Sequence, residues 1–214
     1  MAGRSSGTGR LEAFSDGVMA IAITLLILDV KVPVAEEGRL AHDLAHQWPS
    51  YAAYVVTFLV IGIMWVNHHV LFDRAATVTR PIFYLNIFLL MGVAFLPFPT
   101  ALLAEYLREA QNSHIAAAVY SITMTFIGTM FVLIWAYFLR HPELRTETMS
   151  EDDVRTSLRR SMVGPVIYGA TIALAFVSAY ACLVVYFVMA VYFMVWRPRL
   201  TRAETSPPDQ ASAA

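Results

Sequence analysis

The sequence predicts an all-α, polytopic membrane protein with six transmembrane helices and both termini in the cytoplasm. Its 214 residues are 58% hydrophobic and 14% charged, whereas a soluble domain carries about 25% charged residues. Four runs contain no Asp, Glu, Lys or Arg: 51–72, 81–104, 113–139 and 161–196. Each run reaches the roughly 20 apolar residues that a membrane-spanning helix needs. This pattern excludes a soluble enzyme and a disordered chain, and the single cysteine, Cys182, excludes a disulfide scaffold.

The spans follow from these runs in chain order. Residues 11–32 form a first span that carries charges, and the first three uncharged runs form one span each. The run 161–196 is too long for one crossing, so we expect two short spans. We place the turn between them near 177–181, where Ser178 and small residues stand.

The segments outside the spans are short. We expect an N-terminal segment 1–10, a transmembrane domain 11–197, and a C-terminal tail 198–214 whose prolines and small residues predict disorder. Within the domain, 140–160 is a polar cytoplasmic linker. Its second half starts acidic and ends basic after Ser150, a residue type that favours the N-cap. We therefore expect an amphipathic helix that lies on the membrane surface.

The orientation follows from the positive charges. With six crossings, only Lys31, Arg39 and Arg108 fall on one side of the membrane, and the other 12 of the 15 Lys and Arg residues fall on the other. The side rich in arginine is the cytoplasmic one. No basic stripe indicates nucleic-acid binding, so the lipid bilayer is the expected partner.

Charged residues inside a membrane helix are costly and usually functional. Only the first span contains them: Arg10, Glu12, Asp16 and Asp29. Asp16 lies about one and a half turns inside the span, so it needs a partner. It either snorkels to water as a helix-end charge or forms a fixed polar network with Arg10, Ser15 and neighbouring helices.

Polar residues for such a network occur in the next two spans. The second span holds Asn67, His68 and His69 near its cytoplasmic end, and the third holds Asn86 at a similar depth. Adjacent histidines can suggest a metal site, but neighbours in a helix point about 100° apart. With no other ligand at suitable spacing, we predict structural hydrogen bonds, no metal and no cofactor.

The first span also has an apolar face. Ile21, Leu25 and Leu28 follow the i, i+4, i+7 spacing of one helical face. This pattern is weak by itself because membrane helices are apolar all round.

Three segments resemble the transmembrane protein 175 family of potassium channels. RLEAFSDG at 10–17 resembles its R-x-x-x-F-S-D signature, and WVNHHVLF at 65–72 and NIFLLMGVAFLPFPTALLAEY at 86–106 look like its second- and third-span patterns. The resemblance implies a leak channel in a bacterial inner membrane, with potassium as the permeant ion. One motif copy implies one six-helix unit per chain, a homotetramer, and a pore lined by the first helix. Asp29 departs from the family pattern, so the outer mouth can differ.

Residue roles carry over by position. The resemblance puts the pore constriction on Ile21, with Leu25 and Leu28 continuing outward and the Thr24 hydroxyl nearby. The residues that would hold the first helix against the next two spans are Arg10, Phe14, Ser15 and Asp16. The T-V-G-Y-G loop of carbonyl filters does not occur in the sequence, so ions would cross an apolar neck. Potassium sheds its water more easily than sodium, so such a neck would favour potassium modestly.

Three other functions stay open. A proton-coupled transporter would use Asp16 with His68 or His69 as a relay, although we find no inverted repeat of the kind that transporters often show. A membrane enzyme is disfavoured because no nucleophile–base pair or metal set shares one depth. A scaffold without transport activity is the third possibility.

Overall fold

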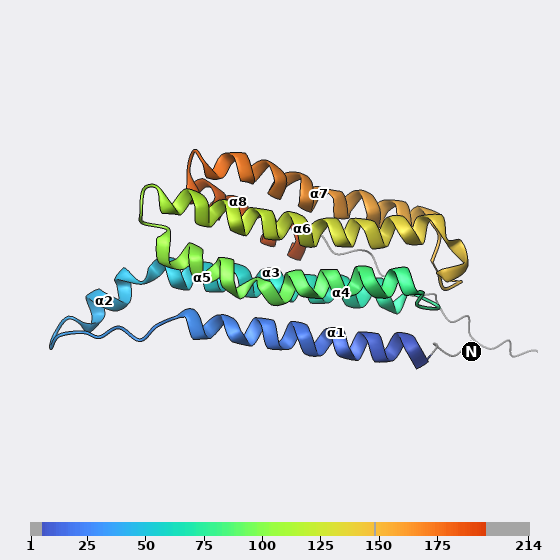
Figure 1. Cartoon of the computed structure of the whole chain (residues 1–214), viewed down its shortest axis with the longest axis horizontal. Coiled ribbons are helices and arrows are strands. Elements are labelled where there is room, and N and C mark those ends of the chain that lie inside the picture. The colour runs from blue at the N-terminus through green and yellow to red at the C-terminus, as the bar shows by residue number, and fades with distance from the viewer. Residues whose placement is uncertain (1–5, 148, 196–214) are drawn as a thin grey trace, which may run out of the picture.

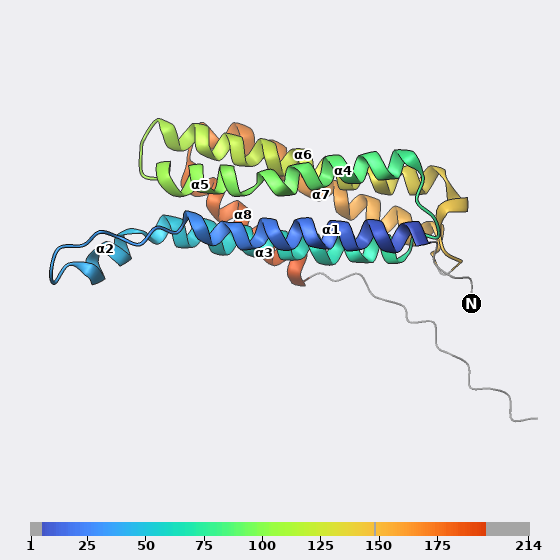
Figure 2. The ribbon, with the colours of Figure 1, turned by 60° about the horizontal axis from the view of Figure 1, so that its bottom comes forward.

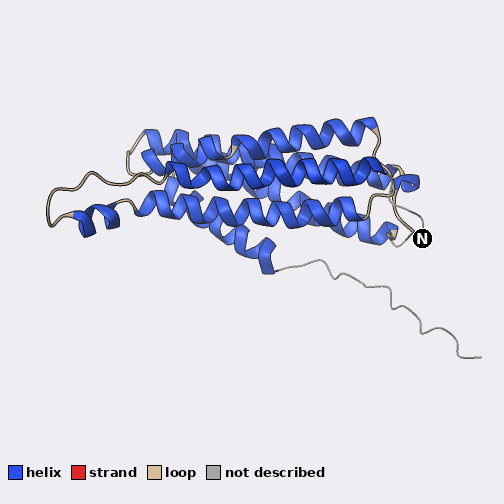
Figure 3. Cartoon of the chain, turned by 90° about the horizontal axis from the view of Figure 1, so that it is seen from below, coloured by secondary structure: helices blue, strands red, loops and turns tan. Residues whose placement is uncertain are grey.

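A computed structural model describes residues 6–147 and 149–195, and this part of the chain is built from helices without a β-sheet (Figures 1 and 3). Eight α-helices and two short 3-10 helices follow one another in this part: α1 (Ser6–Leu25), η1 (Leu26–Asp29), α2 (Leu40–His46), α3 (Trp48–Asp73), α4 (Arg80–Phe95), α5 (Pro97–Tyr106), α6 (Asn112–Arg140), η2 (Pro142–Leu144), α7 (Glu151–Ala175) and α8 (Ala179–Val195). The predicted tail 198–214 and residues 1–5 of the segment 1–10 lie outside the described residues.

Four helical segments in the described ranges are long and apolar enough to cross a membrane. They are Gly7–Asp29, Trp48–Asp73, Arg80–Tyr106 and Asn112–Arg140. The apolar helix α8 is shorter, and α7 begins with the charged residues 151–160. The prediction of an all-α membrane protein is confirmed.

Prolines determine where several helices begin. Pro49 and Pro81 stand in the first turns of α3 and α4, where the missing backbone N–H costs no hydrogen bond. Pro97 interrupts the third span, because proline in a helix interior removes a hydrogen bond and clashes with the preceding turn. The interruption is local: α4 ends at Phe95, Leu96 keeps a right-handed helical conformation, and α5 starts at once.

The linker prediction is half right. Ser150 caps α7 as expected: its Oγ accepts from the Asp153 N–H over 3.1 Å, and the Asp153 carboxylate accepts from the Ser150 N–H over 3.2 Å. The separate surface helix is wrong, because α7 runs without a break from Glu151 to Ala175. The predicted turn before the last helix is confirmed, since α7 ends at Ala175 and α8 begins at Ala179.

Helix α6 lies at the centre of the bundle, in contact with α4, α5, α7 and α8. Two glycines permit this packing. A Cβ on Gly92 of α4 would lie 2.7 Å from Ile127 Cγ1, and one on Gly128 of α6 would lie 2.9 Å from Pro165 Cδ. Helix α1 lies at the edge of the bundle, against α3 and α4 and remote from α7 (Figures 1 and 2).

Candidate functional site

The edge position of α1 and of η1, which continues it, gives this segment two faces. Leu11, Ser15, Met19, Ala22 and Leu26 are buried against the bundle. The opposite face carries Phe14, Ile21, Thr24, Leu25 and Leu28, all exposed on the described chain. Ile21 is 61% exposed and Leu28 is 72% exposed. The Thr24 hydroxyl is turned to its own helix, where it donates to the backbone carbonyls of Ala20 and Ile21.

A chain of buried hydrogen bonds joins α1 to α3 and α4. Asn86 on α4 donates from Nδ2 to Ser15 Oγ over 3.0 Å, and its Oδ1 lies 2.8 Å from His68 Nε2 on α3. Ser15 Oγ in turn donates to the Leu11 carbonyl over 2.8 Å. All three side chains are fully buried. Buried polar groups of this kind hold helices together in membranes because unpaired groups are costly there.

The direction of these bonds fixes the histidine tautomer. Because the Asn86 amide nitrogen is used toward Ser15, the oxygen faces His68 and can only accept. His68 must therefore carry its proton on Nε2. Its Nδ1 has no hydrogen-bond partner within the described ranges, and the neutral ring fits this arrangement.

Two further contacts lie beside this chain on the partly exposed side. Trp65 Nε1 on α3 donates to Asp16 Oδ1 over 2.9 Å, and His69 Nδ1 lies 2.7 Å from Glu12 Oε1. Glu12 and Asp16 are four residues apart on α1, and Trp65 and His69 are four residues apart on α3. The antiparallel helices α1 and α3 therefore meet at two successive turns. The indole of Trp65 also stacks on the His69 ring. Together with the buried chain, these contacts fix the rotation of α1 about its axis.

The structure brings some predicted residues together and leaves others apart. Ser15, His68 and Asn86 form one chain, and Asp16 and His69 lie next to it. Arg10 and Phe14 point to the exposed face of α1 instead. Asp29 ends η1 at the opposite end of the first span, half-buried. The part of the chain that the structure describes contains no group of three His, Cys, Asp or Glu placed to hold a metal ion.

Sequence reasoning missed two partners. The sequence places Trp65 only in the segment WVNHHVLF, which resembles the second-span pattern, and Glu12 only among the charges of the first span. The signal available was spacing: Glu12 and Asp16 are i, i+4 on one helix, and Trp65 and His69 are i, i+4 on another. Antiparallel helices that meet on these faces bring the two pairs together.

Fold and site together define an all-helical membrane protein whose first helix is held by polar contacts on one face and uncovered on the other. Comparison with known proteins agrees with this description of a helical membrane protein. Residues 10–97 match the family described as "Endosomal/lysosomal potassium channel TMEM175". A potassium channel of Streptomyces collinus is 52% identical over 187 residues, which cover 87% of this chain and 91% of the relative. The chain therefore belongs to the TMEM175 family, as its motifs predicted.

A solved structure and an animal relative extend the comparison. The crystal structure of a lysosomal potassium-selective channel TMEM175 homolog from Chamaesiphon minutus superposes with a TM-score of 0.80 at 42% identity, over 89% of this chain and 97% of the other. The endosomal/lysosomal proton channel TMEM175 of Gallus gallus is 39% identical over 142 residues, 62% of this chain but 28% of that longer protein. Family members are thus named as channels.

Proposed function

We propose that this chain is one subunit of a potassium-selective leak channel, and that the uncovered face of α1 lines its pore. The observation that carries the proposal is the division of α1 into a clamped face and an exposed face. Ser15, on the clamped face, and Asp16, beside it, bond to α4 and α3, so the helix cannot rotate freely. Ile21 consequently points away from its own bundle. The names of the bacterial relatives support potassium as the ion.

One α1 helix cannot enclose a pore, so the proposal needs several copies. We propose a symmetric homotetramer with α1 nearest the axis. In such a ring, Ile21 would form the narrowest part of an apolar neck, and Leu25 and Leu28 would line its outer part. An ion would pass the neck only after losing water, which favours potassium over sodium. We propose no catalytic activity for this chain and no cofactor in the pathway.

We propose six membrane crossings, with α7 and α8 as the fifth and sixth, in a bacterial inner membrane. Several arginines gather where α3 and α6 end and α4 and α7 begin, among them Arg74, Arg80, Arg140 and Arg145. Arg145 also ties the two loops at this end: its guanidinium donates to the carbonyls of Phe138 and Leu139, and its backbone pairs with Ala75. By the positive-inside rule this end faces the cytoplasm, with both termini.

Proton conduction is the second candidate, because the animal relative is named a proton channel. A relay from His68 to Asp16, as in a proton-coupled transporter, is poorly supported. His68 bonds to Asn86. An amide side chain does not take up and release protons, as a member of a proton relay must. Protons would then have to share the proposed pore.

Flux through liposomes tests the proposal. Purified protein should pass potassium without a proton gradient, and the rate should not depend on one being imposed. Matched liposomes without protein give the background. Potassium flux that requires a proton gradient would favour the transporter, and no flux of either ion would favour a scaffold.

A further inference from the structure

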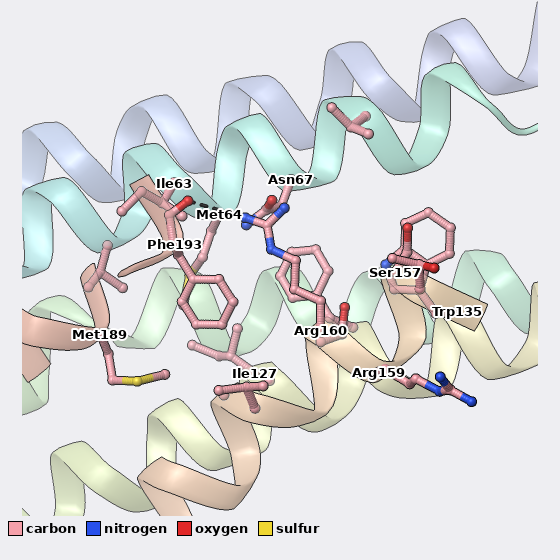
Figure 4. Close-up of a pocket in the computed structure, with 18 of the residues that line it drawn as sticks. Ile63, Met64, Asn67, Ile127, Trp135, Ser157, Arg159, Arg160, Met189 and Phe193 are labelled. Carbon is pink, nitrogen blue, oxygen red and sulfur yellow. Dashed lines mark hydrogen bonds between the residues drawn. The ribbon is translucent and has the colours of Figure 1, made fainter. Parts of the chain in front are cut away.

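A cavity of about 800 Å³ lies between α3, α6, α7 and α8 (Figure 4). It is on the other side of α3 from α1, so it is separate from the proposed pore. The described part of α8 is shorter than α7. With 17 residues α8 spans about 25 Å, whereas the 25 residues of α7 span about 37 Å. In Figure 2 the described part of α8, which ends at Val195, does not reach the end of the bundle where α7 begins.

The cavity changes character along its length. At one end its walls include Arg74, Arg159 and Ser157, and at the other they include Val60, Met124 and Met189. The distance from Arg74 to Val60 along α3 is about 20 Å. A space that is charged near the membrane surface and apolar at depth matches the shape of a lipid, which has a polar headgroup and an apolar chain.

Arg160 lies between the two parts. Its Nη2 donates to the Phe193 carbonyl over 3.2 Å, and its guanidinium lies over the Phe193 ring, 5.7 Å from the centroid. The side chain is half-buried and extends from α7 toward Asn67 and Met64 of α3 (Figure 4). No carboxylate pairs with it among the described residues, in contrast to Arg155, which pairs with Glu151 over 2.6 Å.

Asp152 and Asp153 also line the cavity, but neither forms an ion pair with Arg160, and the three arginines of the lining (Arg74, Arg159 and Arg160) exceed these two carboxylates by one charge. Asp153 is engaged by Ser150, whose backbone N–H and hydroxyl both donate to its Oδ2, and Asp152 is exposed. Arginines inside membrane proteins pair with anions or backbone carbonyls, or face water. The Phe193 carbonyl accepts from only one of the five N–H groups of the Arg160 guanidinium. Guanidinium groups bind phosphate with paired, charge-assisted hydrogen bonds, and basic pockets between membrane helices bind the headgroups of anionic lipids.

We propose that this cavity binds a membrane phospholipid with an anionic headgroup. The phosphate lies at Arg160, Arg74 stands at the charged end of the cavity about 10 Å beyond Asn67 along α3, and an acyl chain follows the apolar wall formed by Ile63, Ile127 and Met189. The lipid belongs to the leaflet in which α7 begins. Because this site lies away from α1, its test does not depend on whether the chain conducts potassium.

Native mass spectrometry of the full chain in mild detergent tests the proposal. The probes are phosphatidylglycerol, phosphatidylcholine with the same acyl chains, and glycerol phosphate without chains. We expect one phosphatidylglycerol per subunit, bound about tenfold more tightly than phosphatidylcholine. Both lipids carry a phosphate, but the choline of phosphatidylcholine adds a positive charge beside the arginines of the cavity. Arg160→Gln should weaken phosphatidylglycerol binding about tenfold, and Arg160→Lys should weaken it less. The control Arg155→Gln, on the same helix but outside the cavity, should bind as the wild type does.

Three results would overturn the proposal. The first is equal binding of the two lipids, and the second is equal binding by Arg160→Gln and Arg155→Gln. The third is full displacement of phosphatidylglycerol by equimolar glycerol phosphate, which would indicate a site for a free phosphate. If Arg160→Gln does not fold, Arg74→Gln replaces it in the comparison with Arg155→Gln. Arg74 also lines the cavity and follows the last residue of α3.

Discussion

The Asn86 amide nitrogen donates a hydrogen bond to the Ser15 hydroxyl over 3.0 Å, and both side chains are fully buried. This bond joins the edge helix α1 to α4, and the same amide accepts from His68 on α3. One side chain thus connects three helices. The exposed face of α1, with Ile21, is defined by this connection.

Replacing Asn86 should therefore loosen α1. Asn86→Ala leaves His68 Nε2 without its acceptor and Ser15 without its donor. Each buried group left without a partner costs about 1–3 kcal/mol, so we expect a loss of about 2–4 kcal/mol in the free energy of unfolding. Denaturant titration in mixed micelles measures this loss. Asn67→Ala is the control, since Asn67 lies on the cavity side of α3, and an equal loss there would contradict the role of Asn86.

Asp16 and Trp65 should show a smaller, coupled effect. Trp65 is 46% exposed, so water partly replaces the lost bond. Asp16→Ala and Trp65→Phe should each destabilise, and a double-mutant cycle should give a coupling of about 1 kcal/mol. Asp16→Asn keeps an acceptor oxygen and should retain most of the stability. Additive effects of the two substitutions would show that the hydrogen bond contributes nothing.

The close approach of α6 and α7 gives a steric prediction. A methyl group on Gly128 would lie 2.9 Å from Pro165 Cδ and 3.2 Å from its nitrogen. Gly128→Ala should cost about 1–3 kcal/mol through overpacking. Gly169→Ala on α7 is the matched control, because nothing lies within 4 Å of the added carbon, and alanine favours a helix by about 1 kcal/mol. Thermal melting of both variants in detergent measures the difference, and a neutral Gly128→Ala would contradict the packing.

The number of copies is a separate prediction. If the exposed face of α1 lines a shared pore, the protein extracted in mild detergent should have the mass of four chains. Native mass spectrometry or light scattering with detergent correction gives this mass. A stable monomer would argue against a pore formed by α1.

Much of the fold could be read from the sequence because charge is so costly in a membrane. The uncharged runs located the long helices, and Ser150 and Ser178 marked a cap and a turn. The continuity of α7 was missed because its charged first half resembles a surface helix, and only tertiary packing shows that it continues past Pro165. The depths of Ser15, His68 and Asn86 were predictable from span positions.

The orientation of individual side chains was less predictable. Arg10 and Phe14 belong to the same motif as Ser15 and Asp16, yet successive residues in a helix point about 100° apart. A motif therefore covers both faces, and the sequence does not say which face meets α3. The role of Trp65 was unpredictable for another reason. A tryptophan in an uncharged run usually contributes only packing, and its N–H acquires a partner only because the fold brings Asp16 opposite it.

The reversal potential under a potassium/sodium gradient, measured for Ile21→Asn and Ile23→Asn, tests most directly whether the exposed face of α1 lines the pathway. Ile21 is exposed, whereas Ile23 packs against the core. Amides at the neck replace part of the lost hydration, so Ile21→Asn should let sodium pass more easily relative to potassium. Leu25→Asn and Leu28→Asn should act the same way more weakly. Ile23→Asn should mainly reduce stability, because it buries an unpaired amide. Unchanged selectivity in Ile21→Asn, or an equal change in Ile23→Asn, would contradict a pore lined by this face.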